Sequence, residues 1–378
     1  MDQNSMKNIQ EIFILAGEPS GDKIGADLLS KLNTSGKFIF TGVGGQKMQQ
    51  EGVKSIYPMS NLSVMGIIDV LFSLPLLLFR NWQTARYIIK KKPDLIILID
   101  SQVFSSMLAK RLRKAGYKNP IILYVAPSVW AWKPERAKNL VGVFDEILAI
   151  LPFEPKVMKK LDGPKTTFVG HPALIENNNQ SPKSKGLIAL FPGSRAGEIK
   201  RHLPLFEYVA KDLKNHPKVT GFVMPTLAHL EQDLRKKTAN WDTEIKIIVE
   251  TEQREEALQD TILSIVTAGT ITLEQALMNI NMLCTYVPDA FMHKQYIKAN
   301  KPLVALPNII LKSEIVPEIY PAGAQGQQVI KEAIKMLDND AIRQKQSLAF
   351  EEMRGLLENG EDDTPRQDPK DRVLAYLS

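Results

Sequence analysis

The sequence has little of what several large classes of protein require. Its 378 residues include one cysteine, Cys284, which excludes an intramolecular disulfide and a cysteine-rich metal site and favours a reducing cytoplasm. Five histidines form no His-x-His or His-x-x-x-His pair, so we expect neither a metal site nor a cofactor. We also expect no signal peptide, because the apolar stretch at residues 12–16 is too short for one.

Two common nucleotide-binding motifs are missing as well. The stretch Gly-Glu-Pro-Ser-Gly-Asp at 17–22 follows an apolar run, but no Gly-Lys-Ser/Thr follows it, which excludes a P-loop. Nor does it have the form Gly-x-Gly-x-x-Gly, so nicotinamide binding has weak support. Glycines at such a turn let a ligand approach the backbone or simply shape the turn, and the sequence leaves both interpretations open.

Charge is concentrated in parts of the chain. The net charge is +6, yet residues 80–160 alone hold 16 basic and 6 acidic side chains, and residues 351–378 hold 8 acidic and 4 basic ones. A basic block of this kind can bind nucleic acid, anionic lipid or a phosphorylated substrate. Alternatively, its side chains form ordinary solvated helix faces. Because no stacked aromatic or recognition-helix motif accompanies it, we expect no nucleic-acid partner.

Short apolar runs alternate with longer amphipathic stretches along both halves of the chain. Such continuous runs are typical of parallel strands covered on both faces, and their alternation with helices favours an α/β fold. A polar stretch at 177–185 is the best linker candidate, and from about Gln325 we predict helix without a further strand. The predicted strands are 12–16, 95–100, 121–125, 187–191, 221–224, 245–249, 262–266 and 302–306.

The most apolar window, residues 62–79, is interrupted by Asp69 and Pro75. A membrane span needs about 20 apolar residues, so we exclude one here. We predict a pair of helices with an exposed apolar face, which would suit a membrane surface beside the basic block, or else plain core.

Polar residues that follow predicted strands are the candidates for chemistry, because open α/β sheets bind ligands at the carboxyl ends of their strands. Asp100 ends one strand and acts as a general base if burial raises its pKa, or else as a helix N-cap. The segment after another strand holds Trp130, Trp132, Lys133 and Arg136. These groups suit a sugar face and a phosphate, and the alternative is a packed loop.

Two glycine-containing loops of the second half suit a diphosphate. The first, at 191–199, carries Ser194 and Arg195 at its tip, and the second, at 267–274, offers threonine hydroxyls and Glu274. Without a Walker lysine, this pair indicates a nucleoside diphosphate bound without a P-loop. Near the end, the Asp-Asn-Asp at 338–340 is similar to the Asp-x-Asp of metal-dependent sugar transferases, but we predict helix capping there.

Together these loops resemble those of the lipid-A-disaccharide synthases, a family of GT-B glycosyltransferases. The run Pro-Ser-Val-Trp-Ala-Trp, with Gly-Glu-Pro-Ser-Gly-Asp upstream, is the most specific feature. The matching segments occur in the family's order: 17–22, 42–48, 63–66, 100, 127–136, 151–154, 168–172, 192–199, 269–274 and 307–308.

The resemblance implies the α/β GT-B class, with two Rossmann-like parallel-sheet domains facing a cleft and C-terminal helices crossing back to the first domain. We expect an acceptor- and membrane-facing domain at 1–176, a UDP-sugar domain at 186–340 and a helical tail at 341–378. The implied reaction is an inverting, metal-independent transfer of 2,3-diacylglucosamine from its UDP donor to 2,3-diacylglucosamine 1-phosphate. It forms the β-1,6 disaccharide 1-phosphate of lipid A and releases UDP.

The implied partners are UDP-diacylglucosamine, diacylglucosamine 1-phosphate and a membrane surface, the inner leaflet of the inner membrane. A cytoplasmic enzyme would be peripheral on that membrane, and whether the chain forms a homodimer is open. Two other interpretations remain. One is a related GT-B enzyme acting on another UDP-sugar, such as an epimerase or a polyprenyl-linked transferase. The other is an inactive membrane-associated scaffold.

The resemblance also implies roles for single residues. Asp100 would remove the proton of the acceptor's 6-hydroxyl, and Arg195 with the loop amides would compensate the charge of departing UDP. The implied substrate-binding residues are Glu18, Ser20, Asp22, Met65, Ser128, Trp130, Trp132, Arg136, His171, Gly193, Ser194, Glu198, Gly269, Thr270, Thr272, Glu274, Asn308 and Glu318.

The chain departs from the family pattern at several of these loops. Reduced activity or an altered substrate is therefore among the hypotheses. The departures are Gln102 for proline, Ser105 for asparagine, Ala126 and Ala268 for serine, Val287 for lysine and Pro321 for glutamine.

Overall fold

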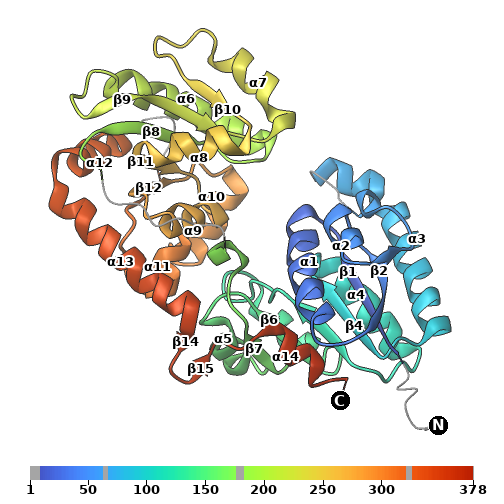
Figure 1. Cartoon of the computed structure of the whole chain (residues 1–378). Helices are drawn as coiled ribbons and strands as arrows, with labels where there is room; N and C mark the ends of the chain where they lie inside the picture. The colour runs from blue at the N-terminus through green and yellow to red at the C-terminus, as the bar shows by residue number, and fades with distance from the viewer. Residues whose placement is uncertain (1–8, 63–66, 176–182, 321–325, 378) are drawn as a thin grey trace. The chain divides into compact units, whose positions relative to one another are not determined.

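The computed structural model describes residues 9–62, 67–175, 183–320 and 326–377, and the chain divides into two compact units (Figure 1). The first unit comprises Met1–Pro172 together with Leu356–Ser378, and the second comprises Ala173–Gly355. The first unit is therefore assembled from two segments that lie far apart in the sequence.

Seven parallel strands form the sheet of the first unit, in the order β3-β2-β1-β4-β5-β6-β7. Every residue of the central strand β4 is buried. Such a strand needs apolar side chains on both faces, which explains its uninterrupted run of Leu and Ile. The strands are β1 Gln10–Ala16, β2 Phe38–Val43, β3 Lys54–Ser55, β4 Leu95–Ile99, β5 Ile121–Tyr124, β6 Glu146–Ala149 and β7 Thr166–Phe168.

Helices cover both faces of this sheet (Figure 1). Alternate residues of β1 point to opposite sides, so Phe13 and Leu15 pack with α3, α4 and α5, whereas Ile12 and Ile14 pack with α1 and α14. The helices are α1 Pro19–Asn33, α2 Gln46–Gln50, α3 Ile67–Lys91, α4 Gln102–Lys114, α5 Glu154–Lys160 and α14 Pro369–Leu374. Short 3-10 helices lie at Met59–Asn61, Pro134–Arg136, Lys138–Leu140 and Pro172–Ile175.

The second unit has a sheet of six parallel strands, in the order β10-β9-β8-β11-β12-β13. Helices α6, α7 and α12 pack on one face of it, around Leu190 and Ile265. The strands are β8 Gly186–Phe191, β9 Val219–Pro225, β10 Lys246–Ile248, β11 Thr261–Val266, β12 Met282–Thr285 and β13 Glu318–Ile319. The helices are α6 Ala196–Leu213, α7 Ala228–Thr238, α8 Thr251–Gln259, α9 Thr270–Leu277, α10 Ala290–Lys298, α11 Leu306–Leu311, α12 Gln327–Asp338 and α13 Asp340–Asn359.

The predicted α/β class and all but one of the predicted strands are confirmed. The prediction of a strand at 302–306 is wrong. Ala305 makes a single bridge to Gly269, and α11 then begins at Leu306 with Pro307 in its first turn. Proline lacks the N–H that a strand ladder needs and fits the start of a helix, so this apolar run does not extend the sheet.

Two further predictions need correction. The C-terminal segment is not entirely helical, because β14 (Gly360–Glu361) and β15 (Thr364–Pro365) form a small antiparallel hairpin. The described part of residues 62–79 does not form a helix pair, because from Ile67 one helix, α3, continues through Pro75 to Lys91; residues 63–66 lie outside the described residues. A proline within the helix removes one backbone hydrogen bond without ending it here.

The described part of α3 exposes apolar side chains, as predicted. Leu74, Leu76, Leu78, Phe79 and Trp82 are each at least 41% exposed. Across the described ranges, no helix combines the length and apolarity that crossing a membrane requires.

An ion pair joins the C-terminal segment to the sheet of the first unit. Glu146 of β6 is fully buried and accepts hydrogen bonds from Arg372 of α14, from Nε over 3.1 Å and from Nη2 over 2.8 Å. The Thr167 hydroxyl also donates to this carboxylate. Burial alone would raise the pKa of Glu146, but the bonds from Arg372 and Thr167 outweigh it and lower the pKa below the ordinary value. The carboxylate therefore stays charged and holds α14 in place.

Replacing Arg372 with methionine should release α14, since it removes the cation that bonds to both oxygens of a buried carboxylate and leaves Lys165, at 3.4 Å, as the nearest remaining cation. We expect α14 docking to weaken by about 3–5 kcal/mol, measured as loss of amide hydrogen-exchange protection over residues 369–374. Lys370→Met is the matched control, because Lys370 pairs with exposed Asp371 at 3.9 Å and such surface pairs contribute about 0–1 kcal/mol. Equal protection in the two variants would contradict the prediction.

Candidate active site

The loops predicted to carry ligands in the first unit lie at one edge of its sheet, because all its strands are parallel and their carboxyl ends meet there. The strand order reverses between β1 and β4, which is where open α/β sheets bind ligands. The loops after these two strands touch: a Cβ added to Gly17 would lie 2.1 Å from Ser101 Oγ. Glycine at position 17 therefore allows the close approach of the two loops.

Asp100 sits on a strained turn. Asp100 and Ser101 both have left-handed backbone conformations, with φ of 51° and 43°. Such conformations cost roughly 1–3 kcal/mol each outside glycine and cluster at functional sites. Burial raises the pKa of Asp100 above the ordinary aspartate value, against the opposing N–H of Ser101. The N-cap residue of α4 is Ser101 and not Asp100, and the Ser101 side chain makes no capping bond.

Two residues that depart from the family pattern hold this turn in place. The Ser105 hydroxyl donates to the Asp100 carbonyl oxygen over 2.8 Å. The Gln102 amide donates to the Ala126 carbonyl oxygen over 3.2 Å, and the Gln102 side-chain oxygen accepts from Arg136 over 3.4 Å. Gln102 thus ties the loop after β4 to the loop after β5, through contacts that a proline side chain could not make.

The loop after β5 holds one inward and one outward tryptophan. Trp130 packs edge-on against Phe153, with ring centroids 5.4 Å apart, and its indole N–H donates to Glu154 over 3.4 Å. Burial raises the pKa of Glu154 to about 8, although the indole and backbone N–H groups oppose this shift. Trp132 is 48% exposed, with Lys133 Nζ 5.7 Å from its ring centroid. Of the two rings, that of Trp132 is therefore the more accessible to a ligand.

Asp22 turns into the protein. Its carboxylate accepts from the backbone N–H groups of Gly45 over 2.8 Å, Lys47 over 3.1 Å and Met48 over 3.1 Å. These donors lie at the start of α2, so Asp22 caps that helix from the neighbouring α1. The carboxylate fixes the glycine turn after β2.

In the second unit, the loop between β8 and α6 has an open tip. Gly193 has φ of +100°, and a Cβ there would lie 2.8 Å from Glu198 Oε2, so the Glu198 side chain folds back over the loop. Glu198 also pairs with Arg195 over 3.0 Å, while the Arg195 side chain remains 81% exposed. Ser194 is exposed beside it. The N-terminus of α6 adds partial positive charge to these open groups.

Sequence reasoning missed His202, a buried residue of α6. Its Nε2 accepts the Val287 N–H over 2.9 Å, so Nδ1 carries the hydrogen and donates to the Glu198 carbonyl oxygen over 2.8 Å. Arg201 donates to the Val287 carbonyl oxygen over 2.9 Å. Burial lowers the pKa of His202 and favours the neutral ring. Together, Arg201 and His202 fix the loop after β12, and a lone histidine in an amphipathic helix carries no signal of such a role.

The second glycine loop leads into α9. Gly269 has φ of +123° at the N-cap. Thr272 is buried, and its hydroxyl donates to the Gly269 carbonyl oxygen over 2.8 Å and accepts the Leu306 N–H over 3.0 Å. Thr270 is exposed at the start of the helix. The two threonines therefore differ: Thr272 braces the loop, and Thr270 faces outward.

Asn308 uses its hydrogen-bonding capacity inside the protein. Its amide donates to the Val316 carbonyl oxygen and to Glu318 Oε1, and its oxygen accepts the N–H groups of Ile315 and Val316, each over 2.8 Å. Glu318 also accepts the backbone N–H groups of residues 304–305 over 2.9 to 3.1 Å. Burial raises the pKa of Glu318, against these opposing bonds. The pair joins the segment before α11 to the start of β13.

The remaining predicted substrate-binding residues fall into separate settings. Exposed ones at the carboxyl edge of the first sheet are Glu18, Ser20 and Ser128. His171 is buried, which lowers its pKa to about 4, and Glu274 pairs with Arg254 over 3.2 Å. Met65 and Pro321 lie outside the described residues.

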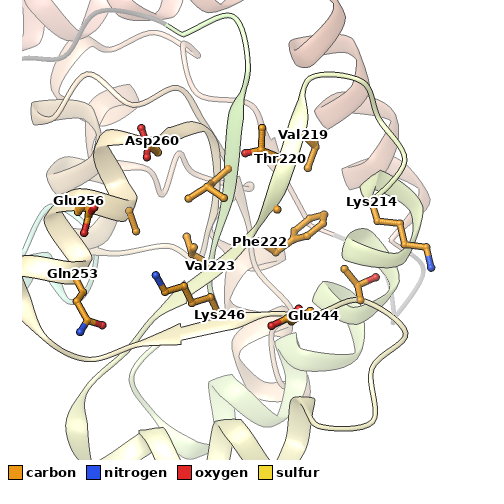
Figure 2. A pocket seen from close by; sticks show the side chains of 14 residues that line it. Lys214, Val219, Thr220, Phe222, Val223, Glu244, Lys246, Gln253, Glu256 and Asp260 are labelled. Carbon is orange, nitrogen blue, oxygen red and sulfur yellow. The ribbon is translucent and has the colours of Figure 1, made fainter.

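Figure 2 shows a hollow of about 500 Å³ in the second unit, beside α8 and the first half of β9. Lys246, Glu256 and Asp260 are among its lining residues. None of the residues that line it is a predicted site residue, and it lies toward the amino ends of the strands, away from the 193–195 loop. Among the described residues, no three His, Cys, Asp or Glu side chains are grouped to hold a metal ion.

Replacing Asn308 with alanine should loosen the second unit. The change removes the acceptor of the Ile315 and Val316 N–H groups and one hydrogen-bond donor to Glu318. We expect it to lower the free energy of unfolding by about 2–4 kcal/mol. We expect faster amide hydrogen exchange over residues 304–306 and 315–318. Asn240→Ala, at an exposed position, should change stability by less than about 0.5 kcal/mol. Unchanged exchange in Asn308→Ala would show that the network does not hold these segments.

Known proteins match nearly the whole chain. The family model described as lipid-A-disaccharide synthetase matches residues 12–367. A lipid-A-disaccharide synthase from Rhodopseudomonas palustris is 30% identical over 98% of this chain and 97% of its own length.

Solved structures share the fold. A UDP-GlcNAc 2-epimerase from Neisseria meningitidis, bound to UDP-GlcNAc, has a TM-score of 0.62 at 10% identity and covers 98% of this chain and 99% of its own. The calicheamicin glycosyltransferase CalG4 has a TM-score of 0.59 at 12% identity, covering 98% of each chain. At such low sequence identities, these two structures indicate the fold of this chain and not its function. The family model and the full-length relative go further, and the chain belongs to the lipid-A-disaccharide synthase family of GT-B glycosyltransferases.

Proposed function

We propose that the chain transfers 2,3-diacylglucosamine from its UDP donor to the 6-hydroxyl of 2,3-diacylglucosamine 1-phosphate, with inversion and without a metal. The product is the β-1,6 disaccharide 1-phosphate of lipid A, and UDP leaves. Membership of the family supports this reaction. The observation that carries it is the partly buried Asp100 on a strained turn where the strand order of the first sheet reverses.

Asp100 is the proposed base on the acceptor. It takes the proton of the 6-hydroxyl as that oxygen bonds to the anomeric carbon of the donor. The bond from this carbon to UDP breaks, and its electron pair leaves on the diphosphate oxygen. The acceptor oxygen attacks the anomeric carbon from the side opposite UDP, which inverts the α configuration of the donor. Because this is a single displacement, one base is sufficient. A raised pKa brings the carboxylate closer to the basicity that this step requires.

Arg195 and Ser194 are the proposed contacts to the departing diphosphate. Both are exposed at the start of α6, where a guanidinium, a hydroxyl and backbone N–H groups can share the developing negative charge. Gly193, Gly269 and Thr270 are proposed to let the nucleotide approach the backbone of the second unit.

Other predicted residues are proposed to act through the loops that they hold. Asp22, Thr272 and Asn308 already bond to backbone groups. We assign these three as positioning residues. Glu154 is assigned the same role toward Trp130.

The exposed apolar side chains of α3 are proposed to meet the inner leaflet of the inner membrane. Leu74, Leu78 and Phe79 would enter the interface, and Arg80 and Arg86 of the same helix would face anionic headgroups. The enzyme would then be cytoplasmic and peripheral, next to its acylated substrates.

Action on another UDP-sugar is the second candidate. The departures from the family pattern beside Asp100, at Gln102 and Ser105, favour it. One experiment separates the two: UDP release from UDP-2,3-diacylglucosamine in detergent micelles with EDTA, with and without the acylated acceptor phosphate. Release that requires the acceptor and persists in EDTA supports the proposal. Release that ignores the acceptor or needs a metal would reject it.

Asp100→Asn should lower kcat by about 10²–10⁴-fold and change the donor KM little, because the amide cannot take the proton. In the wild type, kcat/KM should fall as pH drops through the Asp100 pKa, at a higher pH than for an ordinary aspartate. This acid limb should vanish in the variant. Asp162→Asn is the matched control, since Asp162 also has φ of 51° but is exposed. A variant with wild-type kcat would rule out Asp100 as the base.

Arg195→Ala should lower kcat by about 10²-fold by removing a cation from the leaving diphosphate. Folding should be unaffected, because the side chain is largely exposed. Steady-state UDP release would measure the change, alongside thermal unfolding. Lys200→Ala, an exposed cation on the same helix, should behave like the wild type. Equal kinetics for the two variants would remove Arg195 from the mechanism.

A further inference from the structure

A groove of about 560 Å³ runs along α4 in the first unit. Four residues at helical spacing form one wall: Val103, Ser106, Met107 and Lys110. Between the first and last of them the helix rises about 10 Å. The groove starts at Gln102, the first residue of α4, two residues after the candidate base Asp100.

The other wall comes from the segment after β5. It comprises Trp132, Lys133, Arg136 and Leu140, next to the two short 3-10 helices. The Gln102 side chain bonds to Arg136 and so joins the two walls at the end next to Asp100.

The groove combines apolar surface with charge of one sign. Val103 is 79% exposed and Trp132 is 48% exposed, so the groove presents apolar side chains to the solvent from both of its walls. Lys110, Lys133 and Arg136 line the same hollow, and none of its lining residues is acidic. Apolar surface flanked by cations is complementary to an anionic amphiphile.

We infer that this groove binds the acylated acceptor phosphate, with an acyl chain along Val103, Met107 and Leu140 and the phosphate among the three cations. This inference rests on the proposed function, which identifies the acceptor. A sugar phosphate without acyl chains would leave the apolar wall exposed, and an uncharged acylated sugar would leave the cations without a counter-charge. The groove therefore distinguishes the acceptor by both of its parts.

Binding of short-chain diacylglucosamine 1-phosphate to the full chain, measured by calorimetry below its micelle concentration, tests the inference. We expect Lys110→Glu and Met107→Asp each to weaken binding by about tenfold or more. Lys114→Glu is the matched control, an exposed lysine one turn further along the same helix and outside the groove, and it should bind as the wild type does. Thermal unfolding confirms that each variant is folded.

Three further probes identify what the groove recognises. Glucosamine 1-phosphate lacks the chains, uncharged diacylglucosamine lacks the phosphate, and vesicles of anionic phospholipid offer both in another molecule. Each of the first two should bind more weakly than the complete acceptor. If the groove variants bind the acceptor as the wild type does and lose only vesicle binding, the groove is a membrane contact and the inference fails.

Failure of the inference is distinguishable from failure of the proposed function. Suppose that wild-type UDP release depends on the acceptor but that Lys110→Glu and Met107→Asp have the wild-type KM for the acceptor. The proposed function then stands, and the assignment of the groove to the acceptor is wrong. If acceptor analogues bind with the expected variant pattern but no disaccharide forms, the groove stands and the proposed reaction is wrong.

Discussion

Carboxylates that accept backbone N–H groups hold together the loops of both units; Asp22 and Glu154 are buried and Glu318 is half-buried. Where a parallel strand ends, the chain leaves the hydrogen-bonded ladder, and its buried N–H groups need other acceptors. Asp22 supplies them for the turn after β2, Glu154 for the turn after β6, and Glu318 for the segment before α11. A carboxylate suits this task because its two oxygens can accept from several donors at once. Its desolvation has a cost, visible in the raised pKa values of Glu154 and Glu318.

The periodicity of the sequence is sufficient to predict the architecture, because a buried parallel strand must be apolar on both faces. It fails where local composition misleads. The run at 302–306 is as apolar as a strand, yet Pro307 favours a helix start, and the two-residue strands β14 and β15 are too short to leave a periodic signal. Asp100 and Arg195 could be singled out because they follow a strand or a glycine turn.

The sequence could not predict which polar side chains point into the protein and which point toward a ligand. Asp22 and Asn308 stand in motifs that look like ligand loops, but their partners lie elsewhere in the chain: Asp22 bonds to backbone 23 to 26 residues away. Whether such a side chain turns inward depends on tertiary distances. The same holds for His202, whose partner Val287 is 85 residues away. Gln102 and Ser105 depart from the family pattern, yet both side chains make hydrogen bonds beside Asp100 that the sequence did not predict.

The division of the first unit between the two ends of the chain affects the order in which the protein is made. The second unit is one continuous segment, whereas the first needs Leu356–Ser378 to be complete. Arg372 leaves the ribosome 226 residues after Glu146, its buried partner. On a growing chain, the Glu146 carboxylate lacks Arg372 while the whole second unit is synthesised and able to fold, and its nearer partners are Lys165 and Thr167. Assembly therefore does not run strictly from the N-terminus, because α14 can pack on the first sheet only after the second unit has been made.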